Sequence, residues 1–175
     1  LLPSTLVSLR SDTYVFGEVQ LMGITGGVFT GCENLSDVEF RGMPSLEYIG
    51  ANTFYVTALR EFEIPASVAY VGFSAFLNEY LVSLSVEDGN EVYVADEGVL
   101  YTKDMTTLVC YPSRKAATSY TVPEGVAAIE GYSCEATAFL ETLVIGGDVK
   151  KVGQSAFYNA HALKEITSVS YTHLR

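Results

Sequence analysis

Residues 71–86 read VGFSAFLNEYLVSLSV, with apolar residues at Val71, Phe76, Leu81 and Leu84. Closely similar spacings of apolar residues start again at positions 24, 49, 129 and 152. The five starts are separated by 25, 22, 58 and 23 residues, so regular units are interrupted once by a longer segment. Self-similarity at a short period indicates a solenoid, in which each unit can bury its apolar residues only against its neighbours.

Each unit predicts two short extended segments and a turn. The second half of a unit alternates apolar and polar residues, as in residues 84–86, which is typical of a strand with one buried face. A turn residue such as Pro65 follows, and then a second apolar pair such as Val68 and Val71. The Gly-x-x-Ala-Phe stretch after that pair predicts a short helical turn. We therefore expect an α/β repeat solenoid, with inward phenylalanines stacked at successive levels: Phe54, Phe76 and Phe157.

Residues 64–76, IPASVAYVGFSAF, resemble the signature of BspA-type leucine-rich repeats. Residues 122–129 are similar to the first half of that signature, and residues 96–112 resemble a unit that recurs between repeats in the family. The resemblance covers about residues 24–167, with Cys134 standing where the family has a phenylalanine. It implies a bacterial surface protein that acts in adhesion, located at the cell surface or secreted. Its partner would be a protein or glycan on a host or neighbouring cell.

The repeat pattern also predicts how the chain is organised. Residues 1–167 are expected to form one solenoid fragment, starting mid-repeat because residues 2–9 resemble half a unit. Residues 13–22 predict a further strand. An insertion at about 87–121 contains two β-rich runs around Lys103-Asp104, which predict a hairpin. After Ile166 the pattern breaks, so residues 168–175 are expected to be a non-native or disordered tail, with a genuine terminal strand as the alternative.

Composition narrows the classes of function. Ten Lys and Arg against 21 Asp and Glu give a net charge of −11, which disfavours nucleic acid and anionic membranes as partners. The apolar runs are too short for a membrane-spanning helix, so no direct membrane insertion is expected. Cys32, Cys110 and Cys134 lie far apart in apolar surroundings, which favours buried thiols and lacks the close spacing of a zinc site.

Residues that would indicate an enzyme are missing. The chain has only two histidines, His161 and His173, and contains neither a nucleophile elbow nor a phosphate-binding glycine loop. The acidic run from Glu87 to Glu97 lacks the ligand spacing of an EF-hand, because Val92 and Tyr93 occupy two of its required positions. We therefore expect no catalytic residues, no cofactor and no metal site, with weak calcium binding near Asp88 as the alternative.

The outward residues of the predicted strands form the candidate ligand surface. Side chains alternate along a strand, so the residues between the apolar positions point away from the core. Four carboxylates on adjacent rungs would repel one another unless a cation or a basic partner offsets them. A solvated face kept acidic for solubility is the alternative. The candidate residues are Asp37, Glu39, Glu61, Glu63, Ser83, Ser85, Thr142 and Glu165.

Three functions fit these observations. The first is a non-enzymatic binding or adhesion module within a larger surface protein. The second is a carbohydrate-binding or accessory segment of a polysaccharide-processing protein, and the third is a passive spacer. Tyrosines outside the core positions would suit contact with protein or sugar, because each offers a large rigid area and a hydroxyl group. These are Tyr55, Tyr70, Tyr80, Tyr93 and Tyr158. Half-buried packing is the alternative for each of them.

Overall fold

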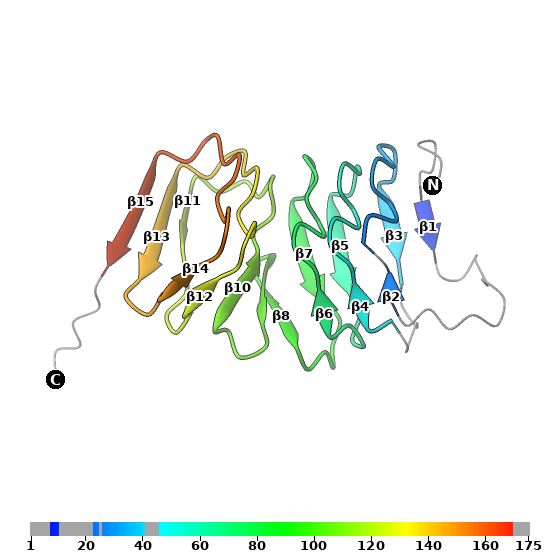
Figure 1. Cartoon of the computed structure of the whole chain (residues 1–175), viewed down its shortest axis with the longest axis horizontal. Helices are drawn as coiled ribbons and strands as arrows, with labels where there is room; N and C mark the ends of the chain where they lie inside the picture. Colours follow the sequence, from blue (N-terminus) through cyan, green and yellow to red (C-terminus); the bar gives the residue numbers. More distant parts are fainter. Residues whose placement is uncertain (1–7, 11–22, 25, 41–45, 170–175) are drawn as a thin grey trace.

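The protein is an elongated stack of coils whose axis follows the long axis of the molecule (Figure 1). The computed structural model describes residues 8–10, 23–24, 26–40 and 46–169. Each regular coil contributes one strand to each of two faces, joined by turns. Strands of successive coils pair in parallel, so neighbouring repeat units are neighbours in space. The repeat pattern thus becomes a leucine-rich-repeat β-solenoid.

The first face carries the alternating strands that the sequence predicts. Its strands form three parallel groups, β1 with β3, β5 with β7, and β11 with β13 and β15. Equivalent repeat positions face each other in the register, as Phe62 does with Leu84 and Leu143 with Ile166. The strands are β1 (Ser8–Arg10), β3 (Asp37–Glu39), β5 (Glu61–Ile64), β7 (Ser83–Val86), β11 (Ser119–Thr121), β13 (Thr142–Gly146) and β15 (Glu165–Val169).

The second face begins each coil. Its strands are β2 (Gly23–Ile24), β4 (Tyr48–Ile49), β6 (Tyr70–Val71), β8 (Tyr93–Asp96), β9 (Val99–Thr102), β10 (Thr107–Cys110), β12 (Ala128–Ile129) and β14 (Lys151–Val152). The predicted unit starts pair with one another, Ile49 with Val71 and Ile129 with Val152. Leu108 pairs with Ile129 in the same register, so the insertion itself contains a unit start that the sequence did not reveal. We name each coil by this first residue: coils 24, 49, 71, 108, 129 and 152.

The predicted short helical turn is wrong. The described residues contain no helix, and a turn follows the second-face strand in each regular coil. The fourth residue of four coils has a positive φ, between 50° and 61°, which breaks any right-handed helical run. These residues are Asn52, Ser74, Tyr132 and Ser155.

Backbone N–H groups in these turns bond to the next coil instead of along a helix. In coil 49, the N–H groups of Asn52, Phe54 and Val56 donate to carbonyls of coil 71 at 3.2, 2.8 and 3.2 Å. Each turn is thereby one rung of a ladder that continues the parallel sheets. Such close stacking needs glycine: a Cβ on Gly72 would lie 2.4 Å from the backbone nitrogen of Ala51.

The phenylalanine ladder forms within the first three regular coils. The rings of Phe29 and Phe54 stack with centroids 5.4 Å apart, and those of Phe54 and Phe76 with centroids 5.5 Å apart. Cys134 is fully buried, as the repeat pattern predicts. Phe157 departs from the expectation: it is half-buried against a second core cluster, and its coil bonds to Cys134 of the preceding coil.

The insertion divides the core in two. Its strands β8, β9 and β10 pair antiparallel, so the structure contains the predicted β9–β10 hairpin and adds β8, which the sequence did not predict. Side chains alternate along β9: Leu100 joins the first core cluster, and Val99 and Tyr101 join the second. This strand is the wall between the two cores.

A buried asparagine fixes the insertion to the preceding coil. Asn90 is 1% exposed, and its amide nitrogen donates to the carbonyls of Pro65 and Val68, both at 2.9 Å. Its side-chain oxygen accepts from the N–H groups of Val92 and Tyr93. All of its bonding capacity is used, which explains how a polar residue is tolerated there.

The two ends of the chain are described only in part. Ser168 and Val169, the first residues of the predicted tail, continue β15 and pair with β13. Residues 170–175, the half-unit up to residue 7 and the strand predicted over 13–22 lie outside the described residues.

Truncating the phenylalanine ladder is expected to destabilise the protein strongly. Phe54→Ala or Phe76→Ala removes a buried ring and leaves a cavity, so we expect a loss of roughly 3–5 kcal/mol in the free energy of unfolding. Phe73→Ala is the matched control, because Phe73 is 56% exposed; its loss should stay within about 1 kcal/mol. Urea titrations followed by circular dichroism measure both. Equal losses for Phe76→Ala and Phe73→Ala would contradict the ladder.

The buried thiols are expected to react slowly in the folded protein. Burial raises the pKa of both Cys110 and Cys134 to about 12. Only about one such thiol in ten thousand is then ionised at pH 8, and the thiolate is the reactive form. Labelling with a chromogenic disulfide should therefore be slow, should accelerate with rising pH, and should become rapid in denaturant. Fast labelling of Cys134 in the folded state at pH 8 would overturn the assigned repeat position.

Candidate functional site

Part of the predicted ligand surface gathers around a groove on the first face. The groove has a volume of about 330 Å³ and lies between β3 and β5. Its floor includes the rings of Phe40 and Phe62, which pack edge to face with centroids 6.2 Å apart. We call it the acidic groove, because it is lined by the carboxylate-bearing residues Asp37, Glu61, Glu63 and Glu87.

The groove arises where the parallel ladder of the first face is interrupted. In the sheets of the described residues, β3 pairs with β1 and β5 pairs with β7, and no ladder joins β3 to β5. The two strands are therefore not joined by a backbone ladder, and the groove lies between them. Glu61 is exposed, whereas Asp37, Glu63 and Glu87 are half-buried.

Glu87 is a groove residue that sequence reasoning assigned elsewhere. It follows β7 and was read as part of the acidic run of the insertion. One of its carboxylate oxygens accepts a hydrogen bond from the N–H of Ala66 at 2.9 Å, which places it beside the turn that follows β5. The sequence offered one signal for this placement. Glu87 lies two residues beyond the outward Ser85, so the alternation of side chains along the strand would point it to the same side.

The other predicted residues do not form one continuous stripe. Ser85 faces Glu63 across β5 and β7 and lines the groove, but Ser83 packs against Gly98, where a Cβ would lie 2.6 Å from the serine hydroxyl. Thr142 and Glu165 pair with each other in the separate sheet beyond the insertion. Glu39 lies in β3 opposite Arg10, and its side chain is outside the described part of the chain.

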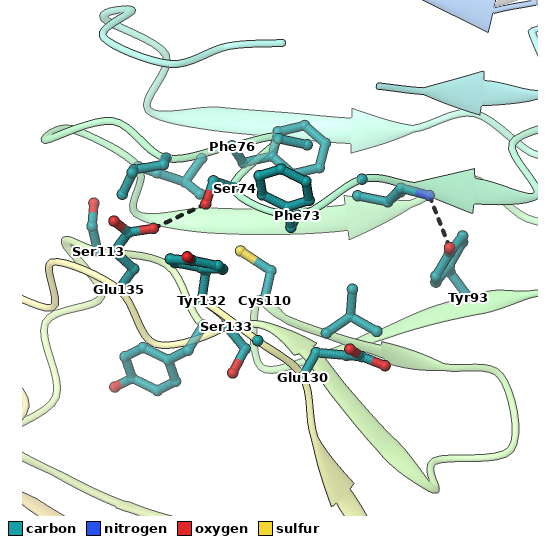
Figure 2. Close-up of a pocket in the computed structure, with 18 of the residues that line it drawn as sticks. Phe73, Ser74, Phe76, Tyr93, Cys110, Ser113, Glu130, Tyr132, Ser133 and Glu135 are labelled. Atoms are coloured by element: carbon teal, nitrogen blue, oxygen red, sulfur yellow. Dashed lines mark hydrogen bonds between the residues drawn. The ribbon is translucent and has the colours of Figure 1, made fainter. Parts of the chain in front are cut away.

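A second concave site lies on the second face, where the insertion separates coil 71 from coil 129. This junction cleft has a volume of about 350 Å³ and is lined by the turn after β6, by strands β8–β10 and by the turn after β12 (Figure 2). It exists because coil 108 uses fewer residues to pass from its second-face strand to its first-face strand. Leu108 and Tyr120 are 12 residues apart, whereas Ile129 and Leu143, with which they pair, are 14 residues apart. The turn of coil 108 therefore fails to fill the space between its neighbours.

Side chains span the cleft at three points. The hydroxyl of Ser74 donates to a carboxylate oxygen of Glu135 at 2.9 Å, and the rings of Phe73 and Tyr132 approach to 5.8 Å between centroids. The hydroxyl of Tyr93 accepts from the N–H of Val71 at 2.9 Å (Figure 2). Tyr93 is therefore a buried structural residue, at 6% exposure, which follows the packing alternative for these tyrosines rather than contact with protein or sugar.

Glu135 is the chemically unusual residue of the cleft. It is 9% exposed and carries a carboxyl group whose pKa is raised by burial, an effect that the hydrogen bond from Ser74 partly opposes. Glu130 lies on the same wall and is exposed. Sequence reasoning missed this cleft, because its walls come from units 58 residues apart and its cause is a shortened turn.

Within the described part of the chain, no three His, Cys, Asp or Glu residues are grouped so that they could hold a metal ion. The same residues include no helix of the length and apolarity that crossing a bilayer requires. His161 is exposed in the turn of coil 152.

The stacked parallel strands and regularly spaced core leucines define a leucine-rich-repeat protein. The sequence profile of the BspA type leucine rich repeat region matches residues 16–102 and 109–172, in six copies. The match covers most of the chain, which therefore belongs to the BspA-type leucine-rich repeat family. Among curated proteins, none matches the chain.

Solved structures of bacterial proteins share this fold. The pneumococcal vaccine antigen PcpA is 30% identical, with a TM-score of 0.80 over 93% of this chain and 38% of that one. A leucine rich cell surface protein from Faecalibacterium prausnitzii is 29% identical, with a TM-score of 0.77 over 92% of this chain and 41% of that one. A leucine-rich repeat protein from Eubacterium ventriosum is 21% identical, with a TM-score of 0.66 over 95% of this chain and 55% of that one, and it shows the fold alone. The chain thus spans about 40% of the length of the two more similar proteins.

Proposed function

We propose that this chain is a non-enzymatic binding module of a larger cell-surface or secreted protein, and that its acidic groove holds a basic segment of a protein ligand. The observation that carries the proposal is the convergence of four carboxylate residues around one concavity with an aromatic floor. One similar protein is described as a cell surface protein and another as a vaccine antigen, which supports a surface location. Adhesion to a host or neighbouring cell is the role that this location favours.

The charge of the groove explains why a basic ligand is favoured. Carboxylates on adjacent strands repel one another, and a lysine or arginine entering the groove offsets that repulsion. Contacts of this kind at a solvated surface weaken as salt screens the charges.

Glycan binding is the second candidate, because two exposed tyrosines lie side by side on the second face. Tyr48 and Tyr70 pair across β4 and β6, at 37% and 56% exposure. Tyr55, Tyr80 and Tyr158 are also exposed by 41% or more. Aromatic rings on neighbouring rungs offer flat apolar area for stacking on a sugar ring. The same face would be inert in a passive spacer.

Reversing charge in the groove is expected to weaken binding of a basic ligand. Glu61→Lys with Glu63→Lys should weaken binding of an oligolysine peptide by roughly tenfold or more at low salt, with a smaller effect at high salt. The control is Glu91→Lys with Glu124→Lys, which makes the same change in net charge at exposed positions outside the groove. Fluorescence anisotropy measures the dissociation constants.

The same variants should be tested against extracellular-matrix proteins and a glycan array. Loss of protein binding only in the groove variant supports the proposed function. Binding to glycans that survives the groove variant and fails in Tyr70→Ala favours the carbohydrate-binding alternative. If both charge variants weaken oligolysine binding equally, the attraction belongs to the overall charge and the groove assignment is wrong.

A further inference from the structure

The ladder between turns follows one rule in coils 24, 49 and 129. The N–H groups of the fourth and sixth residues donate to the carbonyls of the third and fifth residues of the next coil. Asn52 and Phe54 donate in this way to Phe73 and Ala75, and Tyr132 and Cys134 donate to Gln154 and Ala156. All four N···O distances lie between 2.8 and 3.2 Å. Equivalent N–H groups therefore point toward the following coil.

At the junction cleft this rule leaves donors without acceptors. Ser74 and Phe76 are the fourth and sixth residues of coil 71, and both line the cleft. Among the hydrogen bonds of the described residues, neither backbone N–H has an acceptor, because coil 108 places no turn opposite them. Phe76 is 3% exposed, so its N–H is a buried donor, and leaving such a group unpaired is costly.

The opposite wall shows the complementary vacancy. Ser133, the fifth residue of coil 129, accepts from the N–H of Tyr111 at 2.7 Å. The carbonyls of Gly131 and Glu135, the third and seventh residues, have no donor among the described hydrogen bonds, whereas the equivalent carbonyls of Phe73 and Leu77 accept from coil 49. One extended stretch of backbone between the walls could accept from the donors on one side and donate to the acceptors on the other. Such a stretch would supply the rung that the ladder lacks here.

The charge of the cleft adds a second requirement. Glu130 and Glu135 both belong to one wall, and none of the residues that line the cleft is Lys, Arg or His. Phe73 and Tyr132 lie on opposite walls, with Tyr132 beside Glu135 and Glu130 at the other end of the cleft (Figure 2), and aromatic faces attract cations. An occupant with a positive side chain would meet a counter-charge and an aromatic surface together.

We propose that the junction cleft binds a short extended segment of a partner protein, whose main chain supplies the missing rung and whose lysine or arginine meets Glu135, with Glu130 adding negative charge at the other end of the cleft. A volume of about 350 Å³ suits two or three residues and is too small for a folded element. The mode is related to strand addition at a sheet edge, where backbone bonds give affinity and side-chain contacts give selectivity. It uses a site separate from the acidic groove.

Main-chain and charge contributions can be separated with three small probes. The first is the peptide acetyl-Gly-Lys-Gly-amide, the second replaces Lys with norleucine, and the third is n-butylamine, which has the cation without the peptide. Amide ¹⁵N–¹H NMR spectra of the full chain report binding at individual N–H groups. The lysine peptide should shift the Ser74 and Phe76 amide signals and slow hydrogen exchange at Phe76 by roughly tenfold near saturation.

Variants test the same contacts from the protein side. Glu130→Gln removes an exposed charge and is not expected to disturb folding, and it should weaken binding of the lysine peptide by roughly fivefold. Glu135→Gln should weaken it further, and a circular dichroism melt confirms that this variant folds. Glu124→Gln is the matched control and should leave binding unchanged. The groove variant with Glu61→Lys and Glu63→Lys should also bind the peptide normally, which separates this proposal from the proposed function.

Several results would overturn the proposal. It fails if the lysine peptide perturbs neither the Ser74 nor the Phe76 amide up to about 10 mM, well beyond weak affinities. It also fails if n-butylamine binds as tightly as the peptide, because the main chain would then contribute nothing. If the norleucine peptide binds as tightly as the lysine peptide, the carboxylates do not contribute and the proposed charge contact is wrong. Perturbation of the same amides by N-acetylglucosamine, without any by the lysine peptide, would assign the cleft to a sugar.

Discussion

Backbone hydrogen bonding between successive coils is the constraint on which this structure depends. Each coil is too small to bury its own apolar residues, so it must lie directly on its neighbours, about 4.8 Å away. The glycine at the second position of coils 71 and 152 allows that approach, since a Cβ there would collide with the backbone of the coil before it. The turns whose N–H groups bond to the next coil, the stack of phenylalanine rings and the register of both faces all follow from this spacing.

Both concave sites occur where that ladder is interrupted. The acidic groove lies between β3 and β5, which no strand pairing joins in the described sheets. The junction cleft lies where coil 108 takes a shorter path than its neighbours. A regular solenoid offers smooth faces, and its interruptions leave concavities with partly unpaired polar groups. The irregular positions of a repeat protein are therefore the first places to look for ligand sites.

The sequence predicts the parts of this fold that depend on apolar spacing. Unit starts such as Ile49 and Val71 pair in the register expected, and Cys134 is buried in the position of a phenylalanine. The turn conformation could not be predicted in this way, because Ala-Phe stretches are also compatible with a helix. Hydrogen bonds from the turn to the next coil select the observed conformation, and the sequence of one unit does not reveal them. Strand β8 was hidden for a similar reason: its acidic flanks resemble a loop, and its pairing depends on the position of Asn90.

The candidate sites were predictable only in part. The outward carboxylates of β5 follow from strand alternation, which requires no knowledge of neighbours. The separation of β3 from β5 and the shortened turn of coil 108 depend on tertiary packing, so neither the groove nor the cleft could be located from the pattern. Ser83 and Thr142 occupy equivalent outward positions, yet they lie in separate sheets, because the insertion stands between their coils.

The wall formed by β9 also affects how the molecule carries mechanical load. Two hydrophobic cores meet at a single strand, with Leu100 in one and Val99 and Tyr101 in the other. Tension applied along the solenoid axis acts on each coil boundary in series, and the boundary beside the junction cleft has fewer backbone bonds than a regular one. Under such tension the solenoid is expected to open early at this boundary, and the coils on either side would keep their own cores.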